Sequence, residues 1–163
     1  MMFLRILDRL EEWSIAILMA AATLIIFVAV VHRYAATLAI PGVQDFLLSI
    51  NLSWAQELCI YMFIWMAKIG AAYGVRTGIH VGADVFINAL STPWRKFFVI
   101  FGLLTGALFT GIVGTFSVIF IHGLYNTEQV SPDMELPMWM IYLGMPIGSY
   151  LMCFRFLQVS YRF

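Results

Sequence analysis

Four long apolar stretches, joined by more polar connections, set the pattern of this chain. They cover residues 14–31, 54–73, 97–121 and 138–154, and only the second contains charged residues. Eighteen helical residues extend about 27 Å, which is enough to cross the hydrocarbon core of a bilayer. The pattern therefore predicts an all-α integral membrane protein, with four transmembrane helices in a single membrane domain covering residues 1–163.

Amphipathic segments flank these stretches. Residues 1–12 place apolar and charged side chains on opposite sides, which fits either the first turns of span one or a short helix in the membrane interface. Residues 14–31 are longer than a usual signal-peptide core and no convincing small-residue cleavage site follows, so we expect this segment to be retained. Connection 35–53 is too apolar for a free loop, so we expect it to lie on the membrane or on a partner. Within connection 76–93, the apolar residues around 85–90 predict an interfacial helix.

Tryptophan and basic residues predict the orientation. Trp13, Trp54, Trp94 and Trp139 each stand at the start of one span, as in an aromatic belt. Seven Lys and Arg residues fall on the side of the termini and one, Arg33, on the other side. The positive-inside rule therefore predicts that both termini are cytoplasmic. The outward connections are acidic, and their candidate docking residues for a soluble partner are Asp45, Glu128, Asp133 and Glu135.

Composition and the absence of known catalytic motifs argue against several classes of function. The chain has 163 residues, of which 63% are hydrophobic and 11% charged, with a formal net charge of zero. This composition indicates a polytopic membrane protein, and the neutral charge gives no basic field for nucleic acid. The sequence has no phosphate-binding loop, nucleophile elbow or zinc-protease motif, so no enzymatic activity is predicted. Cys59 and Cys153 are interpreted as small core residues.

Span two is the unusual stretch because it contains Glu57 and Lys68. These residues lie about 20° apart around a helix and about 16 Å apart along it, so they cannot pair directly. One hypothesis is a proton or ion relay. The other, which we favour, is a structural charge neutralised by the backbone or by a partner subunit.

Glycines predict close helix packing. Gly70 and Gly74 lie roughly opposite the charged stripe of span two and would let another helix approach. Small-residue pairs recur in spans three and four, where the predicted packing positions are Gly102, Gly106, Gly144 and Gly148. Pro146 predicts a kink in span four.

Histidines leave an alternative open, because membrane subunits of redox enzymes bind haem between histidines on neighbouring helices. His32 and His122 both stand at predicted outer helix ends and could face each other across spans one and three. The simpler interpretation is that they are interfacial residues at helix ends.

An ordered set of short motifs resembles a known family. The set comprises Val30-Val31-His32-Arg33-Tyr34, Trp54-x-x-Glu57, Gly70-Ala71-Ala72, and Arg76-x-Gly78-x-His80-Val81 with Asp84. It resembles the small, DctQ-like membrane subunit of tripartite ATP-independent periplasmic (TRAP) transporters over almost the whole chain. The last third, from Ser131-Pro132-Asp133 onward, looks most like the C4-dicarboxylate branch. Gln56 stands where the family often has a first acid, and Lys68 where an apolar residue is common.

The resemblance implies a non-catalytic scaffold subunit in the bacterial inner membrane, within a sodium-coupled importer of organic acids, with C4-dicarboxylates the favoured substrates. The implied partners are a large multi-span membrane subunit, a soluble periplasmic binding protein and membrane lipids. No cofactor is expected in this chain, and sodium would bind the large subunit. The expected interface or structural positions are Arg33, Trp54, Glu57, Lys68, Gly70, Gly74, Arg76, His80 and Asp84.

Two other functions remain as alternatives at this point. One is a haem- or quinone-binding membrane anchor of an oxidoreductase. The other is a small channel or exporter that assembles through its glycine faces.

Overall fold

The computed structural model describes residues 2–37, 42–77 and 92–162, and these residues are almost entirely helical. The helices are α1 (Met2–Ala35), α2 (Val43–Ser49), α3 (Ser53–Thr77), α5 (Thr92–Thr127), α6 (Met138–Tyr142) and α7 (Gly144–Arg162). Four segments are long and apolar enough to cross a membrane: Arg5–Ala35, Ser53–Thr77, Trp94–Thr127 and Met138–Arg162. The predicted fold class, with four candidate spans, is confirmed.

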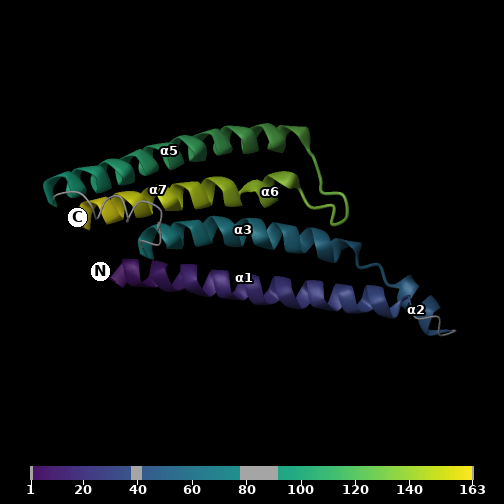
Figure 1. Ribbon diagram of the computed structural model, residues 1–163. Helices are drawn as coiled ribbons and strands as arrows, with labels where there is room; N and C mark the ends of the chain where they lie inside the picture. Colours follow the sequence, from purple (N-terminus) through teal and green to yellow (C-terminus); the bar gives the residue numbers. More distant parts are fainter. Residues whose placement is uncertain (1, 38–41, 78–91, 163) are drawn as a thin grey trace.

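The long helices lie side by side in one layer, in the order α1, α3, α7, α5 (Figure 1). Span four, which is α6 with α7, therefore packs between spans two and three, and α1 and α5 form the two edges. Both chain termini lie at one end of the layer, and α2 lies at the other (Figure 1).

Small residues occupy the contacts between these helices. The buried positions include Ala22, Ala55, Cys59, Ala72 and Ala107, whereas most large apolar side chains are exposed. This is the reverse of a soluble core, and it fits helices that approach closely and turn their bulky side chains toward lipid or a partner.

The helix boundaries show how the residues flanking the spans are folded. Residues 2–12 continue α1 without a break, so they form the first turns of span one. The first connection contains the short helix α2, which the apolar pattern alone did not specify. The predicted interfacial helix at 85–90 lies outside the described residues. Span four is interrupted at Leu143, three residues before Pro146. Because proline cannot donate to the carbonyl four residues earlier, the position of this break agrees with the predicted kink.

Candidate functional site

Glu57 fixes the turn that joins α5 to α6, at the end of the layer opposite the termini. Glu57 is only 9% exposed. Its Oε2 atom accepts hydrogen bonds from the backbone N–H groups of Asp133 at 2.8 Å and Met134 at 3.0 Å. Its Oε1 atom accepts a hydrogen bond from the Tyr61 hydroxyl, one turn further along α3. We call this arrangement the outer latch, where outer means only the end of the layer opposite the termini and inner the end near them.

The turn held by the outer latch is itself highly ordered by hydrogen bonds. Ser131 is 1% exposed. Its backbone N–H donates to the Leu136 carbonyl, and its hydroxyl accepts from the Leu136 N–H. Val130 and Pro137 form an isolated antiparallel bridge. Glu128 and Glu135 have φ angles of 49° and 52°, which are unfavourable for residues with a side chain, so the surrounding contacts must hold this conformation.

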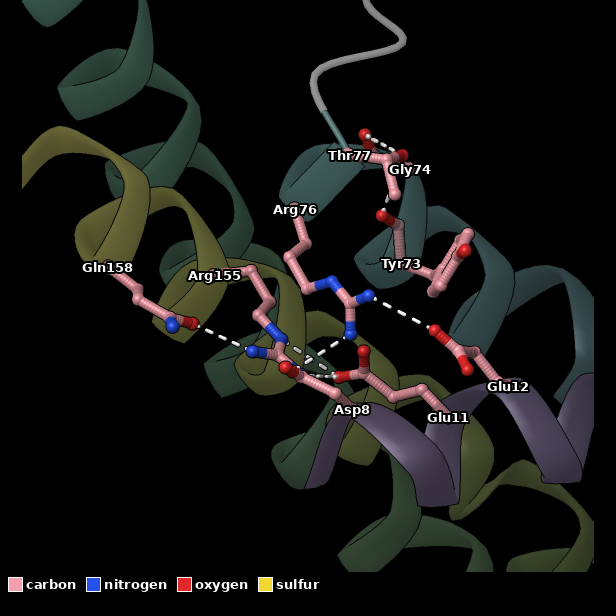
Figure 2. A network of polar contacts seen from close by, with 9 residues as sticks. All are labelled: Asp8, Glu11, Glu12, Tyr73, Gly74, Arg76, Thr77, Arg155 and Gln158. Carbon is pink, nitrogen blue, oxygen red and sulfur yellow. Dashed lines mark hydrogen bonds and ion pairs between the residues drawn. The ribbon is translucent and has the colours of Figure 1, made fainter. Parts of the chain in front are cut away.

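A second polar cluster joins three helices near the termini (Figure 2). Arg155 of α7 is fully buried. Its Nη2 atom lies 2.8 Å from Asp8 Oδ1 and 2.7 Å from Glu11 Oε1, both on α1. Its Nε donates to Glu11 and its Nη1 to Gln158. We call this cluster, together with the Arg76 contacts described next, the inner network.

Arg76 adds α3 to the inner network. Its Nη1 atom lies 2.9 Å from the same Asp8 Oδ1 atom, and its Nη2 donates to Glu12 at 3.1 Å. The guanidinium also lies over the Tyr73 ring, 4.9 Å from the ring centroid. Asp8 thus bridges two arginines from different helices (Figure 2). The bridge ties the ends of α1, α3 and α7 together, a role that suits structural support.

The predicted site residues divide between these places. Glu57 lies in the outer latch and Arg76 in the inner network, whereas His80 and Asp84 lie outside the described residues. Arg33, Trp54 and Asp45 are exposed at the end that contains α2. Glu128, Asp133 and Glu135 are exposed on the α5–α6 turn.

The glycines divide into packed and open positions. A Cβ added at Gly148 would come within 2.5 Å of the Lys68 Cβ, so this glycine lets α7 approach α3. Gly144 likewise lies against Trp65 and Gly106 against Phe156. A Cβ added at Gly70, Gly74 or Gly102 would meet no atom of the described residues within 4 Å. The open glycines leave room for a neighbour from outside the chain.

The suggested pairing of His32 with His122 is wrong, because α1 and α5 form opposite edges of the layer (Figure 1). Each histidine has a local partner instead. The His32 Nε2 atom lies 2.9 Å from the Leu47 carbonyl oxygen of α2, and the His122 ring contacts Asn126. Among the described residues, no three His, Cys, Asp or Glu side chains are placed to share a metal ion.

The charge count of the sequence did not reveal the inner network. That count includes Arg155 only among the cytoplasmic positive charges, and the amphipathic pattern places Asp8 on the polar side of residues 1–12 without indicating a role for Glu11. A usable signal was the single arginine within an otherwise apolar run, Met152-Cys153-Phe154-Arg155-Phe156-Leu157. Such an isolated charge needs a partner when it is buried.

Comparison with known proteins agrees with this architecture. Residues 22–163 match the family model for the DctQ component of tripartite ATP-independent periplasmic transporters. A Rhodobacter capsulatus protein named C4-dicarboxylate TRAP transporter small permease protein DctQ is 53% identical over 178 aligned positions. The alignment covers 98% of this chain and 78% of that relative.

More distant relatives match as well. The protein of the same name from Vibrio cholerae is 30% identical, with 95% of this chain and 71% of the relative aligned. The sialic acid TRAP transporter permease protein SiaT of Haemophilus influenzae is 25% identical, and the match covers 96% of this chain but 23% of that longer protein. The extent of these matches and the four apolar helices lead to one conclusion: this chain belongs to the DctQ family of TRAP transporter small permease subunits, which are multi-pass inner-membrane transport components and not enzymes.

Proposed function

We propose that this chain is the scaffold subunit of a sodium-coupled, binding-protein-dependent importer of C4-dicarboxylates. The observation that carries this proposal is the 53% identity, across 98% of the chain, to a relative named as a C4-dicarboxylate TRAP transporter small permease. The sodium and substrate sites would belong to the large membrane subunit. The small subunit would support that machinery without handling substrate itself.

The single layer of helices supports the scaffold role. Large apolar side chains remain exposed along both edge helices, for example Phe27 on α1 and Phe116 on α5. The described helices form a single layer and enclose no pathway among themselves, an arrangement that suits a platform beside a larger membrane protein. The match to less than a quarter of the SiaT permease is consistent with a large permease partner, because most of that protein lies beyond the shared region.

The surface proposed to contact the large subunit lies on α3. Gly70 and Gly74 follow one another at four-residue spacing, and both have open space where a Cβ would stand. Small residues in this arrangement allow the backbone of a neighbouring helix to come close. The same helix carries Arg76 of the inner network, so its position is fixed at the end near the termini.

The proposed docking surface for the soluble binding protein is the α5–α6 turn. Glu128, Asp133 and Glu135 are exposed there, while the outer latch holds the backbone beneath them. With both termini in the cytoplasm, as the basic residues predict, this turn faces the periplasm. A rigid acidic surface would recruit a partner with basic residues around its docking face.

The first experiment is co-purification in mild detergent with the large subunit, comparing wild type with Gly70→Leu and Gly74→Leu. We expect each leucine to lower the recovery of the large subunit severalfold, because it separates packed helices. Gly123→Leu, an equally open glycine on α5, is the matched control. Undiminished recovery with both α3 variants would refute this interface, and recovery of the wild-type chain without any large membrane protein would refute the scaffold role.

A further inference from the structure

A hollow of about 460 Å³ lies at the end of the molecule opposite the termini. Its walls are the last turns of α1, the short helix α2 and the first turn of α3. The volume falls within the range of small-ligand sites. It would hold the headgroup, glycerol and first methylenes of a lipid, with the tails continuing into the bilayer.

The hollow is lined by both polar and apolar residues. Arg33, Ser53 and Gln56 line the hollow near the ends of α1 and α3. Ile26, Ala29 and Val30 line it further back along α1, roughly 4 to 10 Å from Arg33 along the helix axis. A phospholipid combines the same two kinds of chemistry, because it has a charged phosphate with ester oxygens and an apolar acyl chain. A free anion would lack a match for the apolar half.

Arg33 supplies the charge for this interpretation. Unlike Arg76 and Arg155, it forms no ion pair with any acid of the described part of the chain. Its side chain is exposed and borders the hollow. A guanidinium presents a fork of donors that matches phosphate oxygens, so an unpaired arginine at headgroup depth favours a phosphate.

The short helix α2 places the hollow at the membrane surface. The His32 ring on α1 lies within hydrogen-bond distance of the Leu47 carbonyl oxygen, which fixes α2 beside the end of α1. Phe46 and Leu48 are each 66% exposed, and side chains of this kind on an interfacial helix enter the acyl region. Leu48 also lines the hollow, so its wall is continuous with the surface that faces lipid.

We propose that this hollow binds one membrane phospholipid, with the Arg33 guanidinium donating to its phosphate. Ser53 and Gln56 donate to ester or glycerol oxygens, and one acyl chain lies along Ile26, Ala29 and Val30. The bound lipid fills the space between α1, α2 and α3.

The test is native mass spectrometry of the full-length chain extracted in mild detergent, with retained phospholipid measured as a mass adduct. We expect wild type to retain one phospholipid and Arg33→Gln to retain about tenfold less, because a charge-assisted phosphate contact is lost. The matched control is Arg9→Gln, an exposed arginine at the opposite end of α1. Ala29→Phe, which fills the apolar half with Arg33 intact, should reduce retention in the same way.

Titrating the delipidated chain with phosphatidylglycerol, diacylglycerol or inorganic phosphate distinguishes binding of a phospholipid from binding of an acyl chain or a free phosphate alone. Phosphatidylglycerol should bind, whereas diacylglycerol with the same tails should bind at least tenfold more weakly, and millimolar inorganic phosphate should not compete. Equal loss of lipid in Arg33→Gln and Arg9→Gln would overturn the proposal, as would equal binding of diacylglycerol. Displacement by inorganic phosphate would make this a free-anion site. A photoreactive residue at position 48 that labels the large subunit instead of lipid would make it a protein interface.

Discussion

The carboxylate of Glu57 illustrates how a charge is accommodated at a single residue of an apolar helix. Two backbone N–H groups and one phenol hydroxyl point at its two oxygens, so its hydrogen-bonding capacity is used almost entirely within the chain. Burying a carboxylate with these partners costs less free energy than burying it alone, because directed N–H and O–H donors replace its contacts with water. This favours the structural interpretation of Glu57 over a proton relay.

Replacing Glu57 should therefore change stability more than chemistry. Glu57→Leu leaves two backbone donors and the Tyr61 hydroxyl without their acceptor, and we expect the free energy of unfolding to fall by about 2–4 kcal/mol. Glu57→Gln keeps one acceptor oxygen and should cost about 1 kcal/mol. Thermal unfolding in detergent measures the loss of stability in each variant. Limited proteolysis at residues 128–137 should also be faster in Glu57→Leu than in wild type. A glutamine variant that unfolds normally but abolishes uptake would instead favour a relay.

At the scale of elements, α7 holds the layer together. It packs against α3 on one side and α5 on the other, and its Arg155 reaches α1 as well. Glycines at 144 and 148 allow the close approach to α3, and the inner network fixes the end of the helix. The edges α1 and α5 remain open to lipid or to partners.

A double-mutant cycle should measure the coupling between α1 and α7. Arg155→Leu leaves the buried Glu11 carboxylate without its counter-charge, and we expect a loss of about 3–5 kcal/mol in stability. Arg155→Leu combined with Glu11→Leu should lose clearly less than the sum of the two single changes, because neither charge is then left alone. Arg162→Leu, at the exposed end of α7, is the control. Strict additivity in thermal or denaturant unfolding would show that the pair is not coupled.

On the scale of the whole molecule, the two ends of the layer differ in chemistry. The end with the termini contains the inner network, in which two arginines pair with three acids. The opposite end presents exposed acids on the α5–α6 turn and the Arg33 hollow beside α2. One end is suited to internal support and the other to external contacts.

Charge changes on the α5–α6 turn should alter docking of the binding protein and leave the chain intact. Changing Glu128, Asp133 and Glu135 to Lys should lower the association rate by about tenfold at low salt, with a smaller effect at high salt. The corresponding amides should give an intermediate rate. The association rate is measured by surface-based binding kinetics with the purified binding protein. As a control, co-purification of each variant with the large subunit should be unchanged. Equal rates across the charge series would remove this turn from the docking surface.

Sequence alone determined the membrane character of the chain, its four helical spans and the family. These properties depend on local composition and on short motifs such as Trp54-x-x-Glu57. An apolar run long enough to cross the bilayer must form a helix wherever it packs, because its backbone has no other hydrogen-bond partners in lipid.

Only the tertiary structure decided which helices are neighbours and what each buried charge contacts. Glu57 bonds to backbone groups 76 and 77 residues away, and Arg155 pairs with acids 144 and 147 residues away. The same hydropathy pattern is compatible with several orders of four helices, so it could not place span four between spans two and three. That order depends on the fit of individual side chains, such as Gly148 against Lys68, and such a fit exists only once two distant segments meet.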